Sequence, residues 1–441
     1  MCGINVIKKI NKDISYINFH CQKRGPNQTN IQEINGITFI HNLLHITGTL
    51  TPQPFVTDNV VCIYNGEIYN YQDFGKEYQS DGYCLLDLYQ KYGIDFTKHL
   101  DGEFAIAIID FNQETILIST DVFSTKPIFY CLENDNFMIS SYSSCIQRNN
   151  MKNIIKLEAN KTILFNLNTL QKIKETYVYK FDLNQHKQNY NDWVKAFDNA
   201  IKKRIADSQK KVFVSLSSGY DSGAICCALN QQKFNYKTYT ILGSEDAKVL
   251  QDRFKINIAP HLIYKMNQDT IQKYKKKNME NCCDYQSKVR LNMNTIYSVL
   301  KDNASNGGSF IYQQARNDNY VIGLSGQGAD EIFSDYGFNG VKIKSHSCFG
   351  GKFPNNLSSI FPWESFYGGI GQCLIMKEEI IGGSYGIELR YPFLDKFVVQ
   401  EFLWLHPKLK NKYYKAPLHH YLTINNYPFK KNQKIGFNNL L

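Results

Sequence analysis

Residues 212–222 read VFVSLSSGYDS, and this stretch decides the fold of the larger part of the chain. It begins as an apolar run of strand length, continues into a small Ser/Gly turn, and is followed by a helix-like run over 224–229. Two further apolar runs, 239–242 and 320–324, are separated by stretches with a helical pattern. Alternation of strands and helices predicts a parallel α/β sheet, in which ligands bind at the carboxyl ends of the strands.

The N-terminal part of the chain has a different pattern. Between Ile4 and Lys180, short apolar runs of strand length are separated by turn-prone polar residues such as those at 133–136. This pattern is typical of stacked, mostly antiparallel sheets. The expected strands include 60–64, 104–109, 115–118, 127–130 and 162–165.

The length of the chain, 441 residues, is too great for one small module and fits two domains of ordinary size. Residues 181–190, FDLNQHKQNY, are polar and aperiodic, which is typical of a linker. We therefore expect a β-rich domain over residues 2–185 and an α/β domain over residues 190–441.

The composition excludes several classes of protein. Hydrophobic residues make up 43% and aromatic residues 14%, which excludes long-range disorder, collagen-like repeats and coiled-coil rods. No apolar run approaches the roughly 20 residues of a membrane helix, and the start lacks the apolar stretch of a signal peptide. The 12 cysteines lack metal-site or disulfide-scaffold spacing, so we expect reduced thiols. These features predict a soluble cytoplasmic protein with no membrane partner.

The net charge of +10 raises the question of a nucleic-acid partner. The excess charge is dispersed, and the only dense basic run is Lys275-Lys276-Lys277 in a polar, helical-looking segment. A solvated helix face explains that run better, so we expect no nucleic-acid partner.

A cysteine stands directly after the initiator methionine. Removal of Met1 leaves Cys2 with a free α-amino group, whose ordinary pKa of about 8 lets it act as general base for its own thiol. Nucleophile and base then come in one residue. By itself, a cysteine at this position is more often a matter of chance or ordinary packing.

Several segments follow Cys2 in a characteristic order. They are CGI at 2–4, RGP at 24–26, QP at 53–54, NGEIYN at 65–70, SD at 80–81 and DGEFA at 101–105. As a set they resemble the glutaminase domain of class II glutamine amidotransferases, and most closely that of glutamine-dependent asparagine synthetases. The resemblance covers residues 2–180 and implies an N-terminal-nucleophile αββα fold for this α+β domain.

The resemblance also implies roles for these residues. Cys2 attacks the side-chain amide of glutamine, and the Asn65 side chain and the Gly66 N–H form the oxyanion hole. Glu67 and Asp81 hold the α-amino group of glutamine, as two carboxylates facing an ammonium should. Taken singly, each of these residues has a plainer interpretation. Asn65-Gly66 is a favourable pair for a hairpin turn, and Asp81 could belong to a turn or cap a helix.

One departure from the family concerns the α-carboxylate of glutamine, which the family binds with an arginine. Alignment on the QP segment puts Leu43 or its neighbours at that place. Without the arginine, a bidentate contact is missing. Three alternatives stay open: His41 or His45 substitutes, glutamine binds weakly, or the activity is degraded or redirected.

The turn at 217–222 resembles the Ser-Gly-Gly-x-Asp-Ser loop of ATP-pyrophosphatases. Its small residues let backbone N–H groups approach phosphate oxygens at a helix start, and Asp221 can hold Mg²⁺. Ser218 replaces a family glycine, and a plain Ser/Gly helix cap is the alternative. The implied ATP-binding residues are Leu216, Ser217, Ser218, Gly219, Asp221, Ser222, Ser325 and Gly326.

Three later segments extend the resemblance to residue 437. In LSGQGADEIF, 324–333, Asp330 joins Asp221 at the metal, although Asp330 also suits a helix start. The block GIELRYPFLD, 386–395, carries Arg390, which is either a substrate or a structural guanidinium. In the C-terminal motifs, which begin at Lys415 and Lys434, Lys415 neutralises charge on the α-phosphate and pyrophosphate.

A second departure is Gln327, where the family usually has an acidic residue close to the reacting carboxylate. Glutamine cannot act as a base at neutral pH. Attack by ammonia on an acyl-adenylate does not strictly require an enzyme base, so activity survives in principle, but the acceptor need not be aspartate. The aromatic segment 361–367 either shapes the acceptor pocket or packs as a buried strip.

The resemblance implies two half-reactions in one chain. Cys2 releases ammonia from glutamine, and the second domain uses ATP and Mg²⁺ to adenylate a carboxylate, releasing pyrophosphate. Ammonia that crosses an internal channel then displaces AMP; with aspartate as acceptor, the product is asparagine. The alternatives are a related amide ligase that acts on another carboxylate or uses free ammonia or an amine, and a non-catalytic homologue. The fold allows a homodimer.

Overall fold

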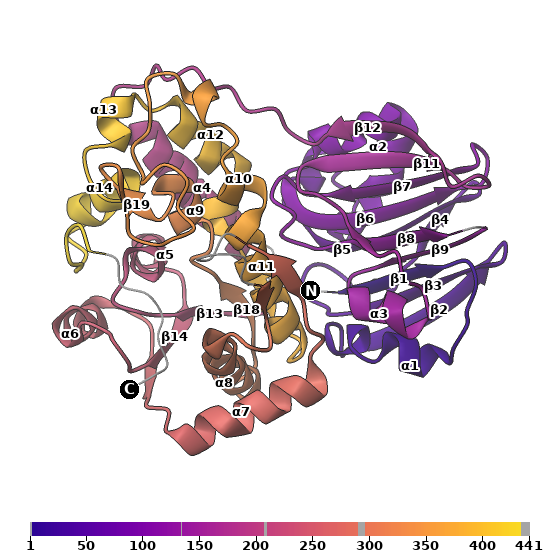
Figure 1. Cartoon of the computed structure of the whole chain (residues 1–441), viewed down its shortest axis with the longest axis horizontal. Coiled ribbons are helices and arrows are strands. Elements are labelled where there is room, and N and C mark those ends of the chain that lie inside the picture. Colours follow the sequence, from indigo (N-terminus) through magenta and orange to yellow (C-terminus); the bar gives the residue numbers. More distant parts are fainter. Residues whose placement is uncertain (1, 134, 207–209, 290–295, 434–441) are drawn as a thin grey trace.

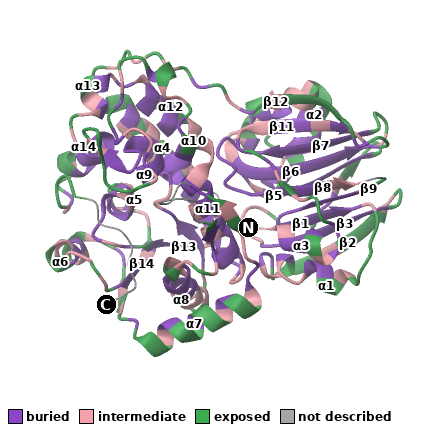
Figure 2. Ribbon diagram, in the orientation of Figure 1, coloured by how far each residue is buried: buried purple, intermediate pink, exposed green. Residues whose placement is uncertain are grey.

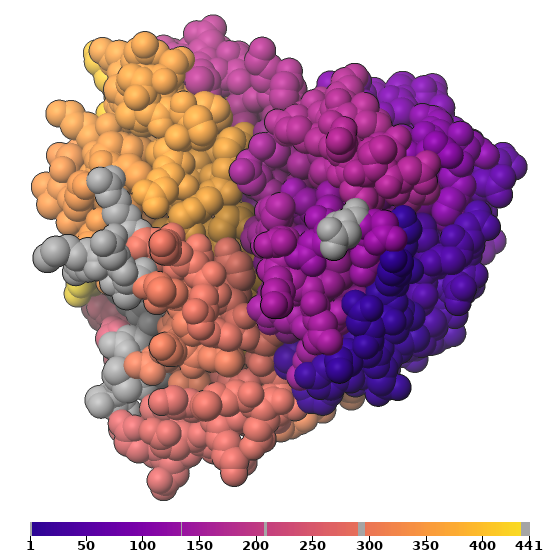
Figure 3. All heavy atoms as spheres, turned by 45° about the vertical axis from the view of Figure 1, so that its right-hand side comes forward, coloured from indigo at the N-terminus to yellow at the C-terminus, as the bar shows by residue number. Residues whose placement is uncertain are grey.

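The computed structural model describes residues 2–133, 135–206, 210–289 and 296–433. Figure 1 shows two bodies that lie side by side, one built of stacked sheets and the other of a sheet surrounded by helices. Their surfaces meet along a continuous boundary in Figure 3. Within the described ranges, no helix combines the length and the apolar character needed to cross a membrane.

The first body consists of two stacked six-stranded sheets in which all neighbouring strands are antiparallel. One sheet has the order β10 (Ile155–Lys156), β8 (Phe129–Glu133), β9 (Asn136–Ser140), β1 (Gly3–Ile7), β3 (Ile37–Leu43) and β2 (Gln28–Ile34). The other has the order β12 (Lys172–Tyr177), β11 (Lys161–Asn166), β7 (Thr115–Thr120), β6 (Gly102–Asp110), β5 (Val60–Ile68) and β4 (Phe55–Thr57). The expected stacked antiparallel sheets are confirmed.

Alternating apolar residues hold the two sheets together. Ile4 and Val6 of β1 face the same buried layer as Val61 and Ile63 of β5, because successive side chains of a strand point to opposite faces. The outer faces are covered by α1 (Ile14–Asn18), α3 (Ser143–Arg148) and α2 (Cys84–Tyr92), as Figures 1 and 2 show. The resulting αββα order is the one expected from the resemblance.

The second body contains a parallel sheet of five strands. Its order is β15 (His261–Tyr264), β14 (Tyr236–Ile241), β13 (Lys211–Ser215), β18 (Tyr320–Leu324) and β21 (Glu388–Arg390). The chain moves outward from β13 in one direction and then returns to β18 on the other side. The crevice between β13 and β18 is therefore a topological switch point, where open α/β sheets bind ligands.

Helices α5 (Tyr220–Gln231), α8 (Asn303–Asn317) and α11 (Gly369–Gly383) pack against this sheet (Figure 1). The other helices of this body are α4 (Asn191–Ile205), α6 (Ala247–Ile256), α7 (Gln268–Asn281), α9 (Ala329–Phe333), α10 (Glu364–Tyr367), α12 (Lys396–Trp404), α13 (Pro407–Lys410) and α14 (Ala416–Ile424). Two small antiparallel strand pairs, β16 (Gln286–Lys288) with β17 (Ile296–Ser298) and β19 (Gly337–Phe338) with β20 (Val341–Lys342), complete the described strands.

Two segments that the sequence singled out can be placed in the fold. Residues 181–190 contain no helix or strand apart from a single bridge between Lys187 and Leu405, and we keep 2–185 and 190–441 as the proposed domains. In the aromatic segment, Trp363 and Phe366 are buried and pack edge-to-face, so this segment serves as core.

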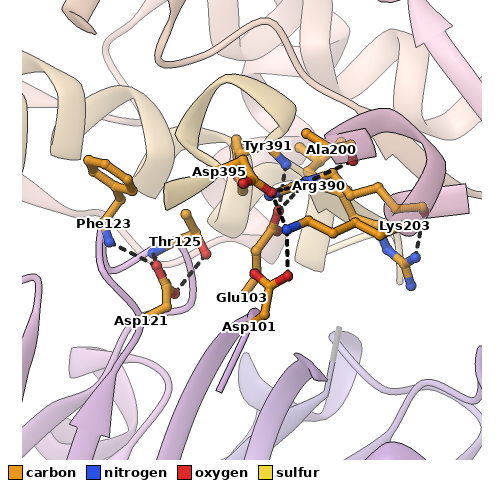
Figure 4. A network of polar contacts seen from close by, with 12 residues as sticks. Asp101, Glu103, Asp121, Phe123, Thr125, Ala200, Lys203, Arg390, Tyr391 and Asp395 are labelled. Carbon is orange, nitrogen blue, oxygen red and sulfur yellow. Dashed lines mark hydrogen bonds and ion pairs between the residues drawn. The ribbon is translucent and has the colours of Figure 1, made fainter. Parts of the chain in front are cut away.

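Buried ion pairs join the two bodies. The carboxylate of Glu379, on α11, forms ion pairs with Arg24 at 2.9 Å and with Lys126 at 3.1 Å. All three side chains are almost fully excluded from solvent. A second group lies at the same boundary, where Lys203 of α4 pairs with Asp101 at 2.6 Å (Figure 4). The next residue, Arg204, contacts Glu103 of β6 at 2.8 Å. Arg204 also contacts Asp395 at 2.8 Å.

We expect Glu379→Gln to lower the free energy of unfolding by about 3–5 kcal/mol, because it leaves two buried cations without their carboxylate. Urea titration followed by fluorescence measures the loss. The matched control is Glu175→Gln, which breaks a pair with Lys172 whose side chains are 42% and 54% exposed. That change should cost less than about 1 kcal/mol. Equal stability of the two variants would contradict the structural role of Glu379.

Candidate active sites

The start of the first sheet forms one side of a small cavity of about 30 Å³. Cys2 precedes β1, and the cavity brings it together with Gly66, Glu67 and Asp81, three other residues of the expected glutaminase site. Asn65 does not line the cavity. The structure therefore gathers four of the five expected residues around one space.

The thiol of Cys2 has one weak partner, the carbonyl oxygen of Leu44 at 4.0 Å. The Cys2 carbonyl accepts a hydrogen bond from Nε of Arg24 at 2.8 Å, which ties the nucleophile to the interdomain ion pairs. Burial raises the pKa of the Cys2 thiol to about 11. At neutral pH this residue is a thiol, so it needs a base before it can attack.

Strand β5 carries the expected oxyanion hole. Gly66 has φ +146°, and a Cβ there would lie 2.0 Å from the carbonyl oxygen of Glu103, so only glycine fits. The Asn65 side chain is fully buried, and in the described part of the chain neither its nitrogen nor its oxygen has a hydrogen-bond partner. A buried amide without partners is costly, which fits a donor kept for a ligand.

Glu67 and Asp81 both have partners within the protein. Asp81 accepts from the Tyr64 hydroxyl at 2.6 Å and from the Ile68 N–H at 2.9 Å. Glu67 accepts from Thr47 at 2.9 Å and forms an ion pair with Arg390 at 3.0 Å. Burial raises the pKa of Glu67 to about 8, although Arg390 opposes the shift. An arriving ammonium group would therefore favour the ionised form of Glu67.

The cavity offers no arginine or lysine among its described lining residues. Leu43 lines it, at the place where the family has arginine. His41 is buried, its Nδ1 accepts from the Gln53 N–H at 3.2 Å, and burial lowers its pKa to about 3, so it is not a cation. Of the two histidines considered, His45 is the one that faces the cavity, and burial lowers its pKa as well.

The second site is a cavity of about 400 Å³ at the carboxyl ends of β13 and β18. The expected ATP-binding residues that line it are Ser217, Asp221, Ser222, Ser325, Gly326 and, from the expected metal pair, Asp330. Leu216, Ser218 and Gly219 do not line it. A Cβ on Gly326 would lie 2.8 Å from Cβ of Asp221, so glycine lets the two loops approach each other.

The loop after β13 is held in a turn by its own hydroxyl groups. Ser222 Oγ accepts from the Ser217 N–H at 3.0 Å and lies 2.9 Å from the Ser217 hydroxyl. The N–H and the hydroxyl of Ser218 both donate to the carboxylate of Glu245. The serine in place of the family glycine thus binds an anionic group of the chain itself.

Lys415 joins the two acidic residues expected at the metal. Its Nζ lies 2.6 Å from Asp221 and 2.8 Å from Asp330, and these carboxylates raise its pKa although burial lowers it. The backbone of Lys415 is left-handed, with φ +47°, directly before α14. Tyr414 donates to Asp330 at 2.7 Å. Lys415 itself does not line the cavity, but it binds two carboxylates that do.

Comparisons with known proteins match two different domains along the chain. A family model described as "Glutamine amidotransferase domain" matches residues 1–190, and one described as "Asparagine synthase" matches residues 192–358. The glutamine-hydrolysing asparagine synthetase of Gallus gallus is 24% identical over 469 residues, covering 93% of this chain and 78% of that protein. That of Homo sapiens is 25% identical, covering 88% and 73%. A putative one of Methanocaldococcus jannaschii is 24% identical, covering 86% and 84%.

The chain belongs to the asparagine synthetase family. It is a divergent member, and it is a ligase that forms carbon–nitrogen bonds. The chemistry of the family is glutamine-dependent, ATP-driven amide synthesis.

Arg390 connects the two sites of this family member. It lies at the end of β21, donates to Glu388 at 2.8 Å and to the Arg204 carbonyl oxygen at 2.6 Å, and pairs with Glu67 of the first site. It is almost fully buried, so its contacts support the structural alternative of the two considered. Sequence reasoning missed its pairing with Glu67; the block at 386–395 was the available signal.

The motif beginning at Lys434 lies outside the described residues.

The raised pKa of Cys2 predicts how this thiol reacts. The thiolate is the nucleophile, so alkylation of the chain that keeps Met1 should accelerate about tenfold per pH unit from pH 7 to 10. Short pulses of iodoacetamide, followed by mass spectrometry of the N-terminal peptide, measure the rate. The processed chain that begins at Cys2 is the matched comparison and should react faster at pH 7, because its own α-amino group accepts the thiol proton. A rate that levels off below pH 9 in the unprocessed chain would contradict the assignment.

Proposed function

We propose that this chain releases ammonia from glutamine at Cys2 and uses it in the second domain to convert an ATP-activated carboxylate into an amide. Aspartate is the proposed acceptor, which gives asparagine, AMP and pyrophosphate. The observation that carries the proposal is the ion pair of Arg390 with Glu67, because it joins the Cys2 cavity to the sheet that holds the second cavity.

In the first half-reaction, the α-amino group of the processed chain takes the thiol proton of Cys2, and the sulfur attacks the side-chain amide of glutamine. The Gly66 N–H and the Asn65 amide stabilise the oxyanion, and ammonia leaves as the thioester forms. The paired carboxylates Glu67 and Asp81 bind the α-amino group. Water then hydrolyses the thioester and releases glutamate.

In the second half-reaction, the loop at 217–222 binds the pyrophosphate portion of ATP in exchange for the Glu245 carboxylate. Ser325 and Gly326 lie beside the AMP portion. The acceptor carboxylate attacks the α-phosphorus, the bond from this phosphorus to the oxygen that bridges to the β-phosphate breaks, and pyrophosphate leaves. Lys415 neutralises the charge that develops there.

Asp221 and Asp330 fit a magnesium ion, because both already turn an oxygen toward one cation, the ammonium group of Lys415, at 2.6 and 2.8 Å. Mg²⁺ is usually held by one or two carboxylates together with substrate phosphates. When bound, it would supply positive charge to the phosphate oxygens of ATP.

A different acceptor carboxylate is the second candidate function. The relatives are asparagine synthetases by name, but Gln327 replaces the acidic residue of the family beside the expected acyl group. Two lysines, Lys344 and Lys377, also line this cavity. These cations are the groups that would select among carboxylate acceptors.

We expect Cys2→Ala to abolish glutamine-driven amide formation and to leave ammonium-driven formation within about threefold of wild type, because the two sites are separate cavities. Pyrophosphate release from ATP, measured with ammonium salt against a panel of carboxylic acids that begins with aspartate, is the assay. Loss of ammonium-driven turnover in the folded variant would contradict separate chemistry. If pyrophosphate were released with another carboxylic acid but not with aspartate, that acid would be the acceptor instead of aspartate.

Leu43→Arg should lower the KM for glutamine, because it adds a bidentate partner for the α-carboxylate to a cavity that lacks one. A charge-assisted hydrogen bond contributes about 1.5–3 kcal/mol, which corresponds to a change of roughly 10- to 100-fold in KM. Leu43→Lys is the matched control and should gain less, since its ammonium is a point charge. An unchanged KM in both variants would show that the carboxylate is bound elsewhere.

A further inference from the structure

Helix α11 presents one carboxylate to the second cavity. Glu378 lines this cavity, and its Oε1 accepts a hydrogen bond from Nε2 of Gln327 at 3.3 Å. Its other oxygen, Oε2, is buried and has no hydrogen-bond partner within the described ranges. The buried oxygen of a polar group is normally satisfied, so this one is available to a ligand.

The other carboxylates of the cavity are engaged. Besides Glu378, the described lining of the cavity holds two carboxylates, Asp221 and Asp330, and both bind Lys415. Glu331, which does not line the cavity, accepts from the Gly328 N–H at 2.8 Å at the start of α9. Glu378 is therefore the lining carboxylate that is not bound to Lys415.

The groups around Glu378 keep it ready to exchange a proton. Burial raises its pKa to about 7, while the Ser325 hydroxyl, Lys377 and Gln327 oppose the shift. Lys377 pairs with Asp302 at 3.2 Å. The next residue of α11, Glu379, is neutralised by Arg24 and Lys126. The phenols of Tyr312 and Tyr391 interact electrostatically with Glu378. A carboxyl group with a pKa near the working pH suits acid–base catalysis.

We propose that Glu378 is the general base of the amide-forming step, a role that rests on the proposed function. The lone pair of ammonia forms the new bond to the acyl carbon. The bond from that carbon to the bridging oxygen breaks, and its electron pair leaves with AMP. One proton passes from the attacking nitrogen to Oε2 of Glu378 and later to solvent. Acyl-adenylate and ammonia thus give amide, AMP and one proton.

The position of Gln327 explains why this chain needs no acidic residue at position 327. The Gln327 amide nitrogen lies 3.3 Å from Glu378 Oε1, so a carboxylate on residue 327 would occupy nearly the same corner of the cavity. The base therefore comes from α11 instead of from the loop after β18.

The test uses the full chain with ATP, the acceptor found in the panel, and ammonium salt, with rates compared at equal concentrations of unprotonated ammonia. Glu378→Gln should leave the first burst of pyrophosphate within about threefold of wild type and slow amide formation by about 10²–10⁴-fold. The wild-type rate should fall as the pH drops below about 7, where Glu378 is protonated, and this dependence should vanish in the variant. Glu378→Asp should recover part of the rate.

The double variant Gln327→Glu/Glu378→Gln should recover at least tenfold over the single variant, because the carboxylate returns to the same corner. Glu280→Gln, on the exposed face of α7, is the control and should match wild type. If Glu378→Gln formed the amide at a rate within threefold of wild type at every pH, the role of Glu378 would be overturned and the proposed function would stand. Loss of the pyrophosphate burst together with amide formation would assign Glu378 to acceptor binding and also overturn it. If the wild-type protein released no pyrophosphate from ATP in response to any carboxylic acid of the panel, the proposed function would be overturned as well.

Discussion

The buried carboxylate of Glu379 is the constraint on which the arrangement of the two domains depends. It neutralises Arg24 and Lys126, which come from the body of stacked sheets, while it belongs to α11 of the body with the parallel sheet. Breaking such a pair leaves an uncompensated charge in a medium of low dielectric constant, so the domains are held in one relation. Arg24 also binds the Cys2 carbonyl, and the residue next to Glu379 faces the second cavity. One turn of helix therefore touches the surroundings of both sites.

Both sites satisfy their charged groups with groups of the chain itself. Arg390 pairs with Glu67, Lys415 lies between Asp221 and Asp330, and Glu245 accepts from the loop that is expected to bind pyrophosphate. Each pairing indicates the charge of the ligand group that would take the place of one partner. The reason is that a buried group stays ionised only beside a group of opposite charge. Ligands of matching charge can exchange with these groups without leaving a buried charge unpaired.

Much of this architecture could be predicted because it depends on local patterns. The apolar runs at 60–64 and 104–109 became parts of β5 and β6, and the run at 212–216 became β13, which ends one residue earlier, at Ser215. The gathering of Cys2, Gly66, Glu67 and Asp81 around one cavity followed from ordered motifs. The partners of these residues could not be predicted in the same way. Arg390 is 323 positions from Glu67, and no spacing in the sequence relates a strand end in one domain to a strand in the other.

The sequence by itself determined the order of the elements, the two sheets of different kinds, and the residue types available for nucleophilic attack and phosphate binding, because periodicity and turn chemistry act over a few residues. Only the tertiary structure decided which charges meet. It showed that His41 is turned to Gln53 while His45 faces the cavity, and that Glu378 stands beside Gln327 with one oxygen unpaired. Such outcomes depend on burial and on contacts between distant segments, which set the cost of every buried charge.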